Sequence, residues 1–346
     1  MIKNIFNWIK QHQLAAFFLL TFLITWGLGF SYGGFMQKGN ELLFPLVSVA
    51  TCGPALAGII ISAITNTEPK VGKHREFWII FFVAMILSAL VFLFQIIFSG
   101  QVEVSPMLVI FALIIVIPVA FVIGLTRSRI PAVRSYLSSL TRLRKVWVWV
   151  LLGFAIPILV MLLSMPISKI ITGKSIPFYQ IPEINLGFFV AAISRFLYQL
   201  FFFNATGEEV GWRGFALPRL QAKTSPLLAA LIITFFWVIW HFFLWQAEGQ
   251  PVLTWQFWMD SFLRNFLFSV MIIWFYNRSN GSILVAGITH AAGNTASLFI
   301  PLEIQGLYLT LLVGILVMIL IDRMWKKLPD DHPAVFHHAL VESSQT

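Results

Sequence analysis

The chain has 346 residues, of which 59% are hydrophobic and only 11% are charged. Soluble proteins carry roughly a quarter of charged residues, so this composition excludes an ordinary water-soluble domain. The formal net charge is +9, but the basic residues fall between apolar runs and not along one continuous face. We therefore attribute the charge to membrane topology and expect no nucleic-acid partner.

Apolar runs long enough to cross a bilayer recur along the chain. A transmembrane helix needs about 20 apolar residues, and the runs lack the alternation of barrel strands, so helices must satisfy the backbone in lipid. We predict an all-α, polytopic transmembrane helical bundle of about ten spans embedded in the lipid bilayer. The predicted spans are 14–36, 42–64, 77–98, 107–125, 146–168, 186–207, 226–246, 256–277, 282–301 and 304–321.

Lysine and arginine concentrate in alternate loops, most densely in residues 126–145. Because cytoplasmic loops carry this excess, we expect both termini in the cytoplasm. We divide the chain into N-terminal helices with a basic cytoplasmic loop (1–145), a core that carries the polar motifs (146–321), and a polar cytoplasmic tail (322–346). The tail contains two prolines, and we expect it to be disordered.

Ionisable residues in a membrane-spanning segment are costly and therefore informative. Glu208 and Glu209 follow three phenylalanines in the sixth predicted span. Glu209 and Arg213 are four residues apart and can pair on a helix, whereas Glu208 points elsewhere into apolar surroundings, which suits a general acid or base. The alternative is a purely structural cluster of ion pairs.

Two further motifs are expected to approach these carboxylates. Glu208 and His241 lie at nearly equal distances from the turn at Thr224, so an antiparallel helical hairpin places them at similar depth. His290 and Asn294 share one helical face and can both donate hydrogen bonds to a developing oxyanion. The alternatives are a core histidine and a polar contact between helices.

Asp260 and Arg264 form another pair with i, i+4 spacing, in the eighth predicted span. The simplest interpretation is that the two charges neutralise each other.

Together the three motifs resemble those of the CPBP intramembrane proteases, which include the type II CAAX prenyl endopeptidases and bacterial Abi proteins. The resemblance covers roughly residues 145–320, and Trp237 stands where the family commonly has Phe. We expect this departure to alter the shape of the pocket and not its chemistry. The motifs EExxxR, FxxxH and HxxxN are matched by Glu208-Glu209-Val-Gly-Trp-Arg213, Trp237-Val-Ile-Trp-His241 and His290-Ala-Ala-Gly-Asn294.

The resemblance implies a glutamate-dependent intramembrane endopeptidase in which Glu208 and His241 activate water. Glu209 and Arg213 would support the site, and His290 with Asn294 would hold the oxyanion. No cofactor is expected; the alternative is a metalloprotease with zinc bound by Glu208, His241 and His290.

The implied partner is a peptide or protein substrate, including membrane-associated or lipidated ones. The implied role is CAAX protease-like cleavage or bacteriocin processing and immunity in a bacterial cell membrane. Two other functions stay open: a non-catalytic immunity or binding protein of the same fold, and a proton-coupled transporter.

Overall fold

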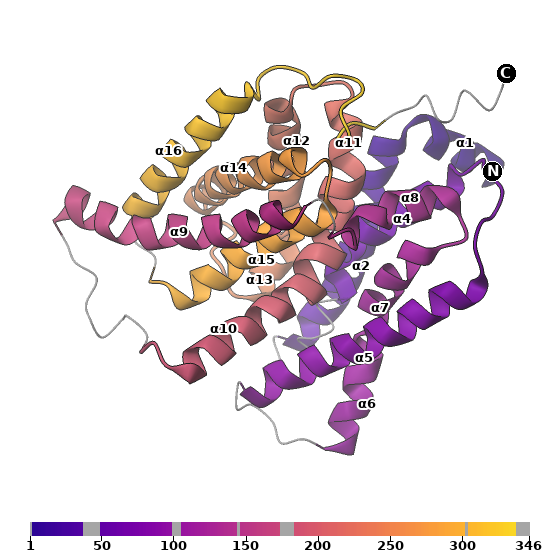
Figure 1. Cartoon of the computed structure of the whole chain (residues 1–346), viewed down its shortest axis with the longest axis horizontal. Coiled ribbons are helices and arrows are strands. Elements are labelled where there is room, and N and C mark those ends of the chain that lie inside the picture. The colour runs from indigo at the N-terminus through magenta and orange to yellow at the C-terminus, as the bar shows by residue number, and fades with distance from the viewer. Residues whose placement is uncertain are drawn as a thin grey trace.

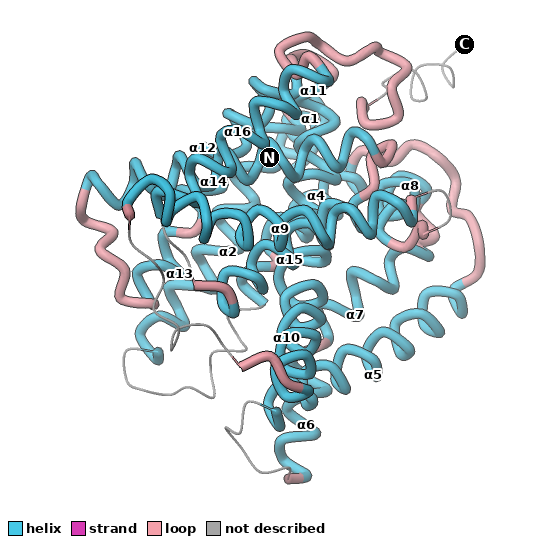
Figure 2. The backbone as a smooth tube through the Cα atoms, turned by 60° about the vertical axis from the view of Figure 1, so that its left-hand side comes forward, coloured by secondary structure: helices cyan, strands magenta, loops and turns pink. Residues whose placement is uncertain are grey.

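The computed structural model describes residues 2–36, 49–98, 105–143, 146–173, 183–301 and 304–336. Within these ranges the chain is helical and contains no strand (Figure 2). The prediction of an all-α bundle is therefore confirmed. The predicted span 42–64 lies partly outside the described residues.

The N-terminal part folds into short and long helices around α2 and α5. Helices α5, α6 and α7 lie together at the lower right of Figure 1, away from α12 and α16. The bounds of this part are α1 Ile2–Gln11, α2 Gln13–Met36, α4 Gly53–Ile64, α5 His74–Phe98, α6 Pro106–Ile115, α7 Ile117–Gly124 and α8 Pro131–Leu137.

The C-terminal part contains the helices that carry the polar motifs. Its central helix is α15, which packs against α9, α10, α14 and the π-helical segment η5 (Figure 1). The bounds are α9 Trp147–Thr172, α10 Leu186–Gln199, η5 Leu200–Glu209, η6 Trp212–Ala216, α11 Leu217–Gln221, α12 Pro226–Trp240, α13 Phe242–Ala247, α14 Trp255–Arg278, α15 Ile283–Phe299 and α16 Ile304–Asp322.

The number of spans is smaller than predicted. Among the described residues, five helices are long and apolar enough to cross a membrane, or up to seven if each of two bent pairs counts as one span. Helices α4 and α15 are apolar but only 12 and 17 residues long. Helix α14 is long enough, but Asp260, Arg264 and Asn265 interrupt its apolar character. The apolar runs in the sequence thus include buried helices of the bundle, which periodicity does not separate from full spans.

The prediction of a disordered tail is wrong for residues 323–336. The backbone N–H of Phe336 donates to the carbonyl of Pro218 at 3.1 Å, and the Gln221 amide donates to the carbonyl of Ala334 at 3.0 Å. The Arg219 guanidinium lies 3.9 Å from the centre of the Phe336 ring. These contacts fasten the tail to the end of α11; residues 337–346 lie outside the described residues.

Candidate active site

Both glutamates of the first motif lie on the π-helical segment η5, which continues α10. π-helical turns are rare and occur often at functional sites. The side chains of Glu208 and Glu209 are 6% and 0% exposed. The sequence predicts a regular α-helix here, so the wider turn is a feature that the spacing of the residues did not reveal.

The second carboxylate, Glu209, is the centre of a buried charge network. Its Oε1 atom accepts a hydrogen bond from Arg213 Nη1 at 2.8 Å and lies 2.8 Å from Nδ1 of His290. Arg213 is fully buried and donates from Nη2 to the hydroxyl of Ser269 on α14 at 3.0 Å. One carboxylate thus connects the first and third motifs, while Arg213 connects the first motif to α14.

Glu208 has different partners. Its Oε2 atom accepts a hydrogen bond of 2.6 Å from the indole Nε1 of Trp237, and its Oε1 atom is 3.4 Å from the Asn204 amide nitrogen. The distance from Oε2 to Nε2 of His241 is 4.0 Å. The first two motifs therefore meet at the Oε2 atom of Glu208.

His241 occupies the end of α12. Ser225 caps the start of this helix by accepting from the backbone N–H of Leu228, Pro226 follows it, and the helix ends at Trp240. The Nδ1 atom of His241 is 2.7 Å from the carbonyl of Trp237. A carbonyl only accepts, so Nδ1 carries the proton, and the lone pair of the neutral ring is on Nε2, the atom closest to Glu208.

His290 and Asn294 lie on α15, which approaches η5 very closely. A Cβ atom on Gly287 would lie 2.6 Å from Cβ of Ala205, so only glycine fits here. This contact is one turn before His290, whose ring is edge-on to Trp237 with centroids 5.2 Å apart. Asn294 follows one turn later and is half-buried.

A cavity of about 330 Å³ opens beside these residues. We call it the histidine cavity. One wall is apolar and comes from α9 and α16, and the other carries polar groups from α12, α14 and α15. Glu208 is not among the lining residues but contacts two of them, Trp237 at 2.6 Å and His241 at 4.0 Å. The lining residues are Pro157, Val160, Met161, Trp237, His241, Trp245, Arg264, Asn265, Phe268, Met271, His290, Gly293, Asn294, Ser297, Leu307 and Leu311.

Zinc bound by Glu208, His241 and His290 is the alternative to a metal-free site. Catalytic zinc is usually held by three protein ligands. In the part of the chain that the structure describes, no three His, Cys, Asp or Glu side chains lie close enough together to hold a metal ion.

Two parts of the site were not predicted from the sequence. Trp237 was expected to be a substitute aromatic, whereas its indole N–H is the closest donor to Glu208. Ser269 was assigned no role, because a single serine in an apolar helix carries no pattern that points to a buried arginine on another helix.

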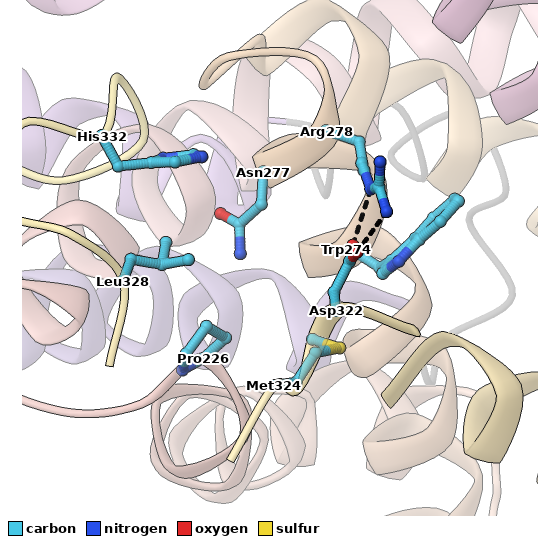
Figure 3. Close-up of a pocket in the computed structure, with 8 residues that line it drawn as sticks. All are labelled: Pro226, Trp274, Asn277, Arg278, Asp322, Met324, Leu328 and His332. Atoms are coloured by element: carbon cyan, nitrogen blue, oxygen red, sulfur yellow. Dashed lines mark hydrogen bonds and ion pairs between the residues drawn. The ribbon is translucent and has the colours of Figure 1, made fainter. Parts of the chain in front are cut away.

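A second cavity, of about 290 Å³, lies near the C-terminal end of α14 (Figure 3). We call it the tail cavity, because Met324, Leu328 and His332 of the tail line it together with residues of α12, α14 and α16. The Arg278 guanidinium faces both oxygens of the Asp322 carboxylate, with Nε to Oδ2 at 2.7 Å. Burial lowers the pKa of His332, and its Nδ1 accepts from the backbone N–H of Ala334. The polar groups at Arg278, Asp322 and His332 are thus paired with one another or with the tail.

These features define a helical membrane protein with buried glutamates and histidines next to a cavity. Residues 186–296 match a family model described as "Type II CAAX prenyl endopeptidase Rce1-like". This region is therefore similar to the type II CAAX prenyl endopeptidases, and the resemblance predicted from the three motifs is confirmed over the matched range. All the motif residues, from Glu208 to Asn294, lie within the matched range.

One curated relative is the "CAAX prenyl protease 2" of Methanococcus maripaludis. It is 32% identical to this chain over 91 residues, which are 25% of the chain and 34% of the relative. The chain thus spans about a third of the length of the relative that it matches. The family-model match at residues 186–296 covers the segment around the site and does not include the N-terminal helices.

Proposed function

We propose that this protein is an intramembrane endopeptidase in which Glu208 and His241 activate a water molecule. The observation that carries the proposal is the pair of acceptor atoms Glu208 Oε2 and His241 Nε2, 4.0 Å apart. A water molecule about 2.8 Å from each atom would see them at an angle of roughly 90°, close to its own H–O–H angle. Both protons would then be held and the oxygen lone pairs left free for attack.

In the proposed reaction Glu208 is the general base. It takes a proton from water as the oxygen attacks the scissile carbonyl, and it returns the proton to the leaving amine. His241 is neutral in this proposal, with its Nδ1–H donating to the carbonyl of Trp237, and it orients the water through the lone pair of Nε2. The Trp237 indole fixes the carboxylate in the position that this transfer requires.

His290 and Asn294 are proposed to stabilise the oxyanion. With Nδ1 donating to Glu209, His290 can donate from Nε2 only as an imidazolium ion. The charges then balance: Glu208 and Glu209 are negative, and Arg213 and His290 are positive. Balance matters because an unpaired buried charge is strongly unfavourable. Glu209 and Arg213 therefore act as positioning residues for His290.

The histidine cavity supports a substrate with an apolar part. Its apolar wall includes Pro157 and Val160 of α9 and Leu307 and Leu311 of α16, and it can pack against a hydrocarbon chain. Because the relative is named a CAAX prenyl protease, we propose a lipidated peptide or protein as the substrate class. The proposed setting is a bacterial cell membrane, with both termini in the cytoplasm.

The purified protein tests the proposal with S-farnesylated CAAX peptides in lipid nanodiscs. We expect hydrolysis by the wild type and by a Glu248→Gln control, whose carboxylate is exposed, and none by Glu208→Gln. Equal hydrolysis by Glu208→Gln would contradict the assignment. An unchanged immunity phenotype in cells carrying Glu208→Gln would instead favour a non-catalytic role.

We further propose that the reaction needs no metal, since a carboxylate and a neutral histidine suffice to orient and deprotonate water. Activity should then survive exhaustive chelation. Stoichiometric zinc in the purified sample, with activity lost on chelation and restored by zinc, would contradict this.

A further inference from the structure

Arg264 of α14 lines the histidine cavity but belongs to none of the three motifs. Its side chain is 49% exposed. A charged arginine in a membrane-embedded helix costs free energy unless it faces water or a charged partner. The groups around Arg264 therefore indicate what it can bind.

Its ion-pair partner, Asp260, accepts no hydrogen bond from it. Arg264 Nη1 and Asp260 Oδ2 are 3.8 Å apart, which is beyond hydrogen-bond distance. The Tyr308 hydroxyl of α16 donates to the other oxygen of the Asp260 carboxylate, which holds this carboxylate toward α16. Among the described residues, the Arg264 guanidinium makes no hydrogen bond. The expected ion pair between Asp260 and Arg264 is therefore present, but it leaves the five N–H donors of the guanidinium without a hydrogen bond.

The position of Arg264 relates it to the reacting groups. Phe268 lies one helical turn further along α14, about 6 Å along the axis, and its ring centroid is 5.5 Å from that of His290. Arg264 and Phe268 are both on the cavity side of α14. A substrate that reaches His290 and Asn294 can thus extend along α14 to Arg264 within the same cavity.

We propose that Arg264 binds a carboxylate of the substrate and so selects acidic peptides. A guanidinium is suited to this because its planar fork matches a carboxylate with two parallel hydrogen bonds. The carboxylate comes either from the peptide C-terminus or from an acidic side chain. This inference rests on the proposed endopeptidase function and names a substrate feature of the same site.

Matched farnesylated peptides distinguish the two sources. The first pair has one sequence and differs only in a free or an amidated C-terminus. The second pair is amidated and carries Asp or Asn near the terminus. Hydrolysis by the full-length protein in nanodiscs gives KM and kcat. Binding of the peptides to the Glu208→Gln variant gives Kd without turnover. Carboxylate binding by Arg264 is therefore tested even if no peptide is cleaved and the proposed function fails.

We expect the preferred acid of one pair to bind about tenfold or more tightly than its neutral partner, as charge-assisted hydrogen bonds imply. Arg264→Gln should reduce the ratio of acidic to neutral peptide affinity to near one, because the KM for the acidic peptide rises. We expect kcat to change less than about threefold. Arg264→Lys should keep part of the preference, because it retains the charge but not the fork. The control Arg278→Gln, at the far end of α14, should keep all of it.

Asp260→Asn provides a second measurement that does not remove the arginine. Because the competing carboxylate is lost, we expect carboxylate peptides to bind more tightly and amidated peptides to bind unchanged. The proposal would be overturned if the wild type bound acidic and neutral peptides with nearly equal affinity, or if Arg264→Gln kept the preference for the acidic peptide. Unchanged or weaker acid binding by a folded Asp260→Asn variant would also overturn it.

Discussion

Helix α14 carries two arginines, each close to an aspartate, and the two pairs differ in kind. At the C-terminal end of the helix Arg278 faces both oxygens of Asp322 and lines the tail cavity (Figure 3). Further toward the N-terminal end Arg264 lies 3.8 Å from Asp260, and the Tyr308 hydroxyl donates to the other oxygen of that carboxylate. The two arginines look alike in sequence, but Arg278 uses two of its N–H groups on Asp322, whereas Arg264 makes no hydrogen bond among the described residues. Free donors beside a cavity therefore indicate a binding role better than charge alone does.

Substitutions at the two cavities are expected to differ most in their effect on the rate of hydrolysis. Glu208→Gln keeps the size of the side chain and an oxygen that accepts a hydrogen bond from Trp237, but it removes the general base. We expect hydrolysis to fall below detection, and His241→Ala to have the same effect, because neither group can replace the other. Arg278→Gln should hydrolyse at the wild-type rate. A progress-curve assay on all three variants checks this, and a comparable loss in Arg278→Gln would remove the distinction.

Asn294→Ala is expected to have the next largest effect. Loss of one oxyanion donor typically lowers the rate by about 10²–10³, and His290 would remain. Residual hydrolysis should thus be measurable in single-turnover experiments, with KM nearly unchanged. Activity equal to that of the wild type would mean that Asn294 only packs against neighbouring helices.

Trp237→Phe tests a contact inside the site. It restores the residue that is common in the family but removes the indole donor to Glu208, 2.6 Å away. Hydrogen bonds to charged groups contribute about 1.5–3 kcal/mol, so we expect kcat to fall by about 10- to 100-fold. Trp240→Phe on the same helix is the control, because its indole N–H has no partner among the described residues. Equal kcat values for Trp237→Phe and Trp240→Phe would mean that the Trp237 indole only packs in the site and does not support Glu208 by its hydrogen bond.

The smallest effect is expected at the tail cavity. Arg278→Gln removes an ion pair whose side chains are 40% and 24% exposed, and such pairs contribute about 0–1 kcal/mol. The melting temperature in detergent should fall by a few degrees at most. A much larger fall in the melting temperature would show that the Arg278–Asp322 ion pair stabilises the fold more than its exposure suggests.

The class of fold and the grouping of the motifs were predictable because they depend on local patterns. Apolar runs predicted helices, and the near-equal spacing of Glu208 and His241 from Thr224 predicted their approach. The bond between His290 and Glu209 depends on how α15 packs on η5, which no spacing along the chain encodes. The π-helical turn was unpredictable for the same reason, since its residues have no distinctive propensity.

Disorder in residues 323–336 was a wrong prediction, and the described residues contain fewer candidate spans than predicted; both differences have a physical reason. A polar, proline-containing segment resembles a disordered tail in composition, but Ala334 and Phe336 find partners on α11 that become visible only in the folded chain. Likewise, apolar composition does not distinguish a helix surrounded by lipid from one surrounded by protein, as with α15, most of whose residues are buried.

The close contact between Gly287 and Ala205 has a consequence for mutational tolerance. The chemistry proposed here depends on a distance between two backbones, and a single methyl group is enough to change it. A Gly287→Ala variant would keep every polar residue of the three motifs and still move His290 away from Glu209, because the added Cβ would meet Ala205 at 2.6 Å. Homologues that retain all the motifs but carry a larger residue at either position are therefore expected to have lost the active arrangement, and the two positions should vary together.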